Sequence, residues 1–190
     1  MVGCPRSTPM KWLDYRLQWE RTRRVLPYVP QGARVLDIAC ADGALFRVLD
    51  GRVSVGVGID LDPVPPSTAK YRYIRGSFPS AMPPGEPFDV VAALAVLEHI
   101  PEADQAGFAA GCARELRGGG HLVVTVPSSR VDDMLRVMKA IRLVDGMRDD
   151  QHYGFDPRKA VDMFERAGLV LERQSRFELG LNHLLVFRKP

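Results

Sequence analysis

The sequence has few cysteines, no long apolar run and no strong excess of either charge, and each absence argues against a class of protein. The three cysteines, Cys4, Cys40 and Cys112, show no paired spacing for a disulfide framework or a metal, which favours a reducing, cytoplasmic setting. No apolar stretch reaches membrane-spanning length, and the N-terminus lacks the apolar core of a signal peptide. The net charge of +3 comes without a basic run for nucleic acid. We therefore expect a soluble protein that binds no metal and no nucleic acid.

The length and composition predict one globular domain. A chain of 190 residues with 46% hydrophobic content is long enough to bury a sizeable core. Residues 1–10 contain two prolines and little pattern, so we expect a loose tail followed by a single domain over residues 11–190. Such a domain is compatible with a monomer or a homodimer.

The most informative stretch is residues 34–49, which predicts a buried strand, a tight turn and a helix. Aliphatic residues surround Asp37 in the strand, small residues follow at positions 39–43, and apolar residues then recur at helical spacing. Unpaired backbone N–H groups at such a helix start receive the polar atoms of a ligand. The carboxylate of Asp37 would repel phosphate and attract an ammonium group, which favours a ligand with a cationic end.

A second acid follows the next predicted strand. The apolar run at residues 53–59 ends at Asp60, 17 residues after Gly43. A carboxylate at this place in a βαβ unit accepts hydrogen bonds from both hydroxyls of a ribose.

From about Val25 to Phe187, the chain resembles the class I S-adenosylmethionine-dependent methyltransferases. Their first motif, an acid followed by alternating glycines, reads here as residues 37–43, with alanine in place of glycine at positions 39 and 41. Alanine is tolerated there at negative φ and is strained at positive φ. The resemblance implies S-adenosyl-L-methionine as cofactor and contacts to it from Asp37, Ala39, Cys40, Ala41, Gly43, Asp60, Leu61, Ser77, Phe78, Ala95 and Leu97. In the family the position of Leu61 packs on the adenine ring and that of Ser77 receives the adenine amino group; core packing and a plain turn are the respective alternatives.

The resemblance also suggests residues on the acceptor side. The apolar run at residues 90–95 is followed closely by Glu98 and His99. These two residues lie at the strand end where ligands bind in open parallel sheets. Methyltransferases of small molecules often carry a histidine with an aromatic residue ahead of a late helix, as His152 and Tyr153 stand here before Asp156-Pro157. His152, His99 and Tyr153 are therefore our catalytic candidates, with His152 first as a general base. The alternatives are that His99 only caps the next helix and that His152 is a loop residue without a role.

The predicted fold class is α/β, a Rossmann-like, doubly wound sheet of seven strands with helices on both faces. The sheet is mostly parallel, and a short turn after residues 168–172 predicts an antiparallel last strand over residues 181–188. We expect a proline-rich, irregular crossover after Asp60 and a glycine-rich turn at residues 117–121 before the fifth strand. Further helices are predicted at residues 11–26, 102–116, 131–144 and 158–167.

Two of these helices bear on the site. In the family, a leading helix covers the cofactor pocket, which suggests such a role for Trp12, Tyr15 or Trp19; the alternative is packing on the sheet. Methionines on or near the helix at residues 131–144 would form an apolar wall for an acceptor with a lipid or sugar portion, unless that helix only packs on the sheet.

The predicted function is transfer of a methyl group from S-adenosylmethionine to a small-molecule acceptor by in-line displacement. The protein mainly aligns donor and acceptor, and a base is needed only when the acceptor must lose a proton. A catalytically silent binding module is one alternative, because Ala39 and Ala41 replace glycines. An NAD-dependent oxidoreductase is another, although Asp37 and the terminal hairpin argue against it.

Overall fold

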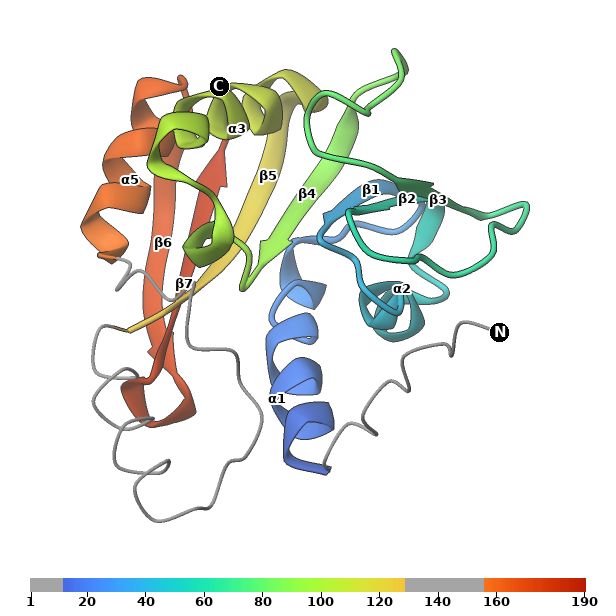
Figure 1. Cartoon of the computed structure of the whole chain (residues 1–190), viewed down its shortest axis with the longest axis horizontal. Coiled ribbons are helices and arrows are strands. Elements are labelled where there is room, and N and C mark those ends of the chain that lie inside the picture. The colour runs from blue at the N-terminus through green and yellow to red at the C-terminus, as the bar shows by residue number, and fades with distance from the viewer. Residues whose placement is uncertain (1–11, 129–155) are drawn as a thin grey trace, which may run out of the picture.

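A seven-stranded sheet forms the centre of the computed structural model, which describes residues 12–128 and 156–190, with side chains from Tyr15 onward (Figure 1). The strand order is β3-β2-β1-β4-β5-β7-β6, and β7 alone runs in the opposite direction to the other strands. The predicted fold class is thus confirmed. The strands are β1 (Ala33–Ile38), β2 (Val53–Asp60), β3 (Tyr71–Arg75), β4 (Phe88–Leu94), β5 (Leu116–Pro127), β6 (Val170–Phe177) and β7 (Asn182–Arg188).

Helices cover both faces of the sheet, as predicted. One apolar cluster joins β1, β4 and β5 to α3 and α5, and a second joins them to α2 and the segment after α1. In Figure 1, α1 extends past the lower end of β4. The helices are α1 (Trp12–Thr22), α2 (Ala44–Leu49), α3 (Glu102–Glu115) and α5 (Pro157–Arg166), with single 3-10 turns at Leu26–Tyr28, Leu97–His99 and Glu178–Gly180. Among the residues described, no helix is both long and apolar enough to cross a membrane.

Strand β1 lies in the middle of the sheet because its residues tolerate burial on both faces. It pairs in parallel with β2 on one side and with β4 on the other. Leu36 and Ile38 belong to the cluster under α3, whereas Val35 belongs to the cluster under α2. The carboxyl ends of β1, β2 and β4 therefore meet at one edge of the sheet, where parallel α/β sheets bind ligands.

The terminal hairpin brings distant residues to the same edge. Strand β7 pairs with β5 so that Asn182 stands opposite Pro127, and it pairs with β6 so that Asn182 also stands opposite Phe177. The start of β7 therefore lies beside the carboxyl ends of β5 and β6.

The glycine-rich segment differs from the prediction. We expected a turn at residues 117–121, but β5 already begins at Leu116 and these residues belong to the strand. A Cβ atom on Gly120 would lie 2.9 Å from the carbonyl oxygen of Asp89, so the glycine lets β5 approach β4 closely. The crossover after Asp60 contains no helix, as the prolines predict. The predicted helix at residues 131–144 lies outside the described residues.

Candidate functional site

The turn between β1 and α2 has a left-handed backbone at three alternating positions. The φ angles are 61° at Ala39, 44° at Ala41 and 72° at Gly43. The backbone N–H of Ala39 donates to the carbonyl of Ile59 at 2.8 Å, and that of Gly43 donates to the carbonyl of Cys40, also at 2.8 Å. Both alanines thus adopt the conformation that favours glycine, at a cost of about 1 kcal/mol or more each. Both side chains are exposed, so each methyl group projects into the open edge of the sheet.

Asp60 binds the same turn from the end of β2. One carboxylate oxygen accepts the backbone N–H of Ala41 at 2.8 Å, and the other accepts that of Asp62 at 2.9 Å. An ionised carboxylate has room for about four hydrogen bonds, so each oxygen keeps capacity for one more donor. Asp60 therefore holds the turn in place and is still able to receive the two hydroxyls of a ribose.

Gly43 is needed at the helix start for a reason beyond its φ angle. A Cβ atom at this position would lie 2.4 Å from the hydroxyl oxygen of Tyr73 on β3. Tyr73 packs edge-on against Phe46 of α2, with ring centroids 6.0 Å apart, and so supports the turn from behind. A side chain at position 43 would push this ring away or distort the turn.

Asp37 is a buried acid among other acids. Its side chain is 4% exposed, and burial, followed by the nearby charges of Asp60 and Asp42, raises its pKa to about 8. The charged neighbours that perturb its titration are thus both acidic, and a cation placed beside them would stabilise all three carboxylates. This electrostatic arrangement fits a ligand with an ammonium or sulfonium group, which S-adenosylmethionine has.

The residues expected near the adenine lie at the ends of β2 and β3. Leu61 is 69% exposed, so its side chain is open to a ligand rather than part of the core. Ser77 is also exposed, and its carbonyl closes a turn by accepting the N–H of Ala81 at 2.8 Å. Phe78 is half-buried and packs edge-on against Phe108 of α3, with centroids 5.3 Å apart. Leu61 and Ser77 thus face the solvent, whereas the ring of Phe78 packs against α3.

The end of β4 turns sharply at Ala95, which has a φ of 52°. Its backbone N–H donates a shared hydrogen bond to the carbonyl oxygen and to the hydroxyl oxygen of Thr125 on β5, with N···O distances of 3.0 Å to each. Thr125 was not among the predicted site residues, although a threonine inside the apolar run at residues 122–126 is the signal that marks it. Beyond the turn, Leu97 is fully buried in the core and His99 is exposed. Ala95 and His99 therefore lie at the site edge, and Leu97 lies beneath it.

Helix α1 contacts the turn between β1 and α2. The side-chain amide of Gln18 donates to a carboxylate oxygen of Asp42 at 3.0 Å. Tyr15 and Trp19 are 54% and 53% exposed and line a cavity of about 540 Å³ between α1 and α2, instead of being buried against the sheet. The side chain of Trp12 lies outside the described part, as do His152, Tyr153 and the methionines at positions 134, 138 and 147.

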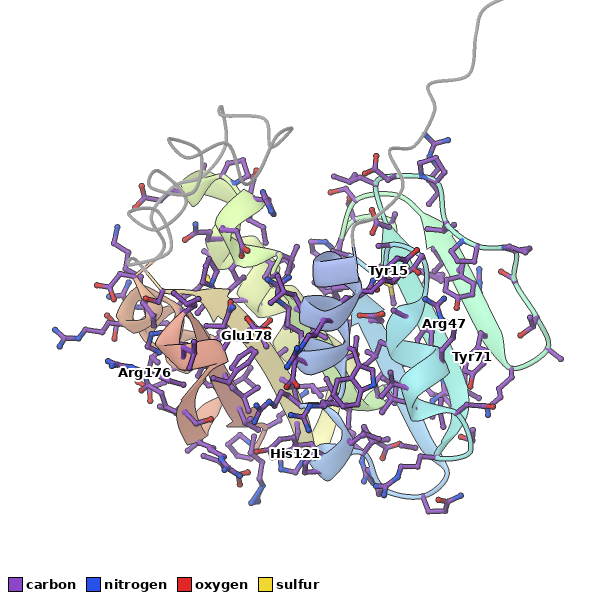
Figure 2. All side chains as sticks on the ribbon, turned by 90° about the horizontal axis from the view of Figure 1, so that it is seen from below. Tyr15, Arg47, Tyr71, His121, Arg176 and Glu178 are labelled. Carbon is purple, nitrogen blue, oxygen red and sulfur yellow. The ribbon has the colours of Figure 1, made fainter. Side chains whose placement is uncertain are left out.

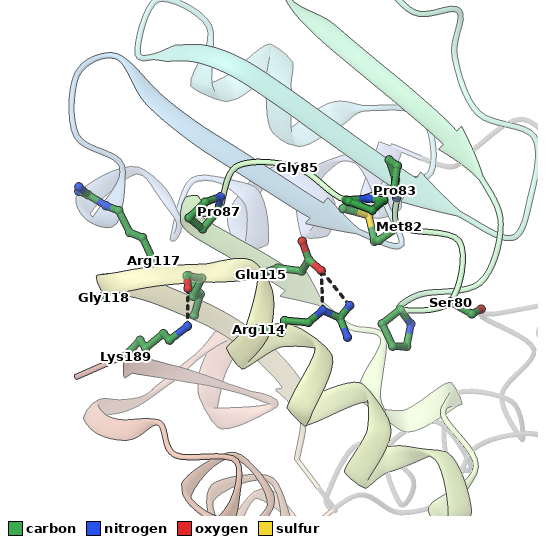
Figure 3. Close-up of a pocket in the computed structure, with 13 residues that line it drawn as sticks. Ser80, Met82, Pro83, Gly85, Pro87, Arg114, Glu115, Arg117, Gly118 and Lys189 are labelled. Carbon is green, nitrogen blue, oxygen red and sulfur yellow. Dashed lines mark hydrogen bonds and ion pairs between the residues drawn. The ribbon is translucent and has the colours of Figure 1, made fainter.

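Another cavity, of about 890 Å³, lies away from this edge, near the starts of β4 and β5 (Figure 3). Its polar groups bind one another: Lys189 donates to the carbonyls of Ala113 and Leu116 at 2.8 and 2.7 Å, and Arg114 pairs with Glu115 at 2.8 Å. None of the predicted site residues that the structure describes lines it. Those described residues lie instead at or just beyond the carboxyl ends of β1, β2, β3 and β4.

Comparisons with known proteins show the family to which this chain belongs and solved structures with a similar fold. Residues 10–174 match a family model described as a methyltransferase domain. A ubiquinone biosynthesis O-methyltransferase from Thiobacillus denitrificans is 30% identical over 172 residues, which are 83% of this chain and 71% of that protein. The protein of the same name from Hahella chejuensis is 35% identical over 117 residues, 56% of this chain but only 47% of its own length. This chain thus spans about half of the second relative.

A solved structure supports the same architecture. The N-methyltransferase NodS from Bradyrhizobium japonicum, in complex with S-adenosyl-l-homocysteine, superposes with a TM-score of 0.70 at 16% identity. The match covers 95% of this chain and 93% of that one. At this identity the likeness concerns the fold alone.

Proposed function

Because the chain belongs to the family of S-adenosylmethionine-dependent methyltransferases, we propose that it transfers the cofactor's methyl group to a hydroxyl oxygen of a small acceptor with a hydroxylated aromatic ring. The choice of an oxygen acceptor rests on the similarity to the Thiobacillus denitrificans protein, whose name specifies O-methylation in ubiquinone biosynthesis. Methyl ethers on a quinone ring derive from ring hydroxyl groups, which gives the aromatic acceptor.

The proposed cofactor site uses the residues at the open edge of the sheet. Asp37 faces the cationic methionine end, Asp60 receives the ribose hydroxyls and Leu61 packs against the adenine. The side chain of Ser77 provides a further polar contact, and the small residues of the turn at residues 39–43 let the cofactor approach the backbone. When bound, the cofactor supplies a methyl group on a positively charged sulfur, which an oxygen nucleophile displaces in line.

A hydroxyl acceptor has to lose its proton during this transfer, so the site needs a proton acceptor. His99 lies at the end of the 3-10 turn after β4, close to the edge where the methyl group would be presented. His152 and Tyr153 remain candidates for the same task. The cytoplasmic location expected from the cysteines, and a monomer or homodimer that binds no nucleic acid, complete the proposal.

Incubation with S-adenosylmethionine and a panel of catechols and monophenols tests this function. We expect S-adenosylhomocysteine to form only when a hydroxylated ring is present, with a mass gain of one methyl group on its oxygen. Amines and bulk tRNA serve as competing acceptors. Methylation of either of these without methylation of any phenol would contradict the proposal. Failure to bind S-adenosylhomocysteine, together with no turnover on any acceptor, would favour the silent binding module.

A further inference from the structure

A partly buried polar cluster lies where the β6–β7 hairpin approaches α1. Glu178 follows β6 directly, and Figure 2 shows its side chain beside α1. The side-chain amide of Asn182, at the start of β7 and only 6% exposed, donates to one carboxylate oxygen of Glu178. Among the positive charges around this carboxylate, that of Arg21 on α1 lowers its pKa the most. We call Glu178, Asn182 and Arg21 the hairpin cluster.

The hairpin cluster contains polar atoms that the described residues leave without a partner. The second carboxylate oxygen of Glu178 is buried and accepts no hydrogen bond, and the Nε atom of Arg21 is buried and donates none. Arg21 and Glu178 do not form an ion pair with each other among the contacts of the described residues. Burying such an acceptor and such a donor unpaired is costly, and a ligand that brings a polar group to these atoms would relieve that cost.

The backbone under the hairpin cluster is held in an unusual conformation. Glu178, Leu179 and Gly180 have φ angles of 50°, 56° and 86° in succession. Two of the three are not glycine, and such residues concentrate at functional sites, where the fold maintains a costly geometry. The turn keeps Glu178 directed at α1 while the side chain of Leu179 is fully exposed.

Helix α1 connects this cluster to the turn after β1. Gln18, which binds Asp42 in that turn, precedes Arg21 by three residues, so the two side chains are neighbours on the helix surface, about 5–6 Å apart at Cβ. Asn182 also stands opposite Pro127, two residues after the Thr125 that holds the end of β4. The hairpin cluster thus lies at the same sheet edge as the cofactor residues, on the side of β4 and β5.

Building on the proposed function, we propose that the hairpin cluster is the polar end of the acceptor site and hydrogen-bonds a hydroxyl group of the aromatic acceptor. The free oxygen of Glu178 and the Nε–H of Arg21 offer one acceptor and one donor, which is the pairing that a hydroxyl group requires. Burial is the main cause that raises the pKa of Glu178 above its ordinary value.

A purely structural role would make the hairpin cluster a latch between α1 and the hairpin. A latch predicts that loss of Glu178 lowers the melting temperature and weakens cofactor binding, because α1 also contacts Asp42. An acceptor site predicts that Glu178→Gln, which keeps the shape of the side chain, weakens only acceptor binding.

The chain offers a specific probe, because Asn182 is its single asparagine. Protein labelled with ¹⁵N-asparagine therefore shows one side-chain amide in an NMR spectrum. We would titrate it with catechol, in the presence of saturating S-adenosylhomocysteine, for the wild type and for Glu178→Gln. Glu165→Gln on the exposed surface of α5 is the matched control for loss of an acidic charge.

We expect catechol to shift the Asn182 amide signals saturably in the wild type and in Glu165→Gln. Glu178→Gln should bind catechol about tenfold more weakly, with an unchanged melting temperature and unchanged affinity for S-adenosylhomocysteine. Methylation of catechol with an unmoved Asn182 signal would overturn the inference and leave the proposed function intact. A shifted signal without methylation of any phenol would support the acceptor site and contradict the proposed function. Equal losses of stability, cofactor affinity and catechol affinity in Glu178→Gln would identify a latch.

Discussion

Replacing Ala39 by glycine should stabilise the protein. Ala39 has a φ of 61° and an exposed side chain, so the change relieves a left-handed conformation without leaving a cavity. The same holds for Ala41, at a φ of 44°. Few substitutions to glycine stabilise a folded chain, which makes the direction of the effect informative.

The magnitude follows from two opposing terms. A non-glycine residue loses about 1–2 kcal/mol in the left-handed region. Glycine costs about 0.5–1 kcal/mol through the greater freedom of the unfolded chain. The net gain is therefore about 0.5–1 kcal/mol per site, which corresponds to roughly 1–4 °C in melting temperature for a chain of this length. Because the two alanines are close together, the gains need not add.

Urea denaturation and thermal melting of Ala39→Gly, Ala41→Gly and the double variant measure this gain. Ala110→Gly is the matched control, because Ala110 is exposed within α3 and should lose about 1 kcal/mol. We also expect cofactor affinity to change little, because the turn is already left-handed without the cofactor. A loss of stability in Ala39→Gly equal to that of Ala110→Gly would refute the left-handed geometry of the turn.

Three further predictions concern the same edge of the sheet. Gly43→Ala should lower the melting temperature and weaken cofactor binding, and Tyr73→Phe should restore part of both, because it removes the hydroxyl 2.4 Å from the new Cβ. In the protein without cofactor, the pKa of Asp37 is raised to about 8, whereas in the unfolded chain its carboxyl group ionises at about pH 4. Between these two pH values, Asp37 is ionised in the unfolded chain and protonated in the folded one. The free energy of unfolding should then fall by up to about 1.4 kcal/mol per pH unit, and Asp37→Asn should remove this slope in urea titrations at several pH values. Thr125→Val should cost about 1 kcal/mol and raise the KM for the cofactor, whereas Thr125→Ser should retain wild-type values, in calorimetry and initial-rate assays.

The local pattern of the chain was sufficient to predict the strand–turn–helix at residues 34–49 and the order of the elements around it. Apolar runs bounded by small residues or proline indicate buried strands directly, and the short connection before β7 implies its reversed direction. The sequence also placed Asp37 and Asp60 at the ends of buried strands, and the structure has them at the carboxyl ends of β1 and β2.

Contacts across the sheet were not predictable in the same way. Tyr73 supports Gly43 because β3 lies beside β2, and nothing in the local sequence of either residue shows this packing. Glu178 and Asn182 reach the carboxyl edge of the sheet only because β7 runs antiparallel between β5 and β6. The left-handed geometry of Ala39 and Ala41 likewise depends on hydrogen bonds from β2, which override the preference of alanine.

Isothermal titration of the protein with S-adenosylhomocysteine tests the central claim most directly, with NAD as a control ligand and Asp60→Asn as the variant. We expect binding of the order of micromolar for S-adenosylhomocysteine, at least about tenfold weaker binding in Asp60→Asn, and none for NAD. Equal affinity in the wild type and in the variant, or binding of NAD alone, would contradict the placement of the cofactor at the turn between β1 and α2.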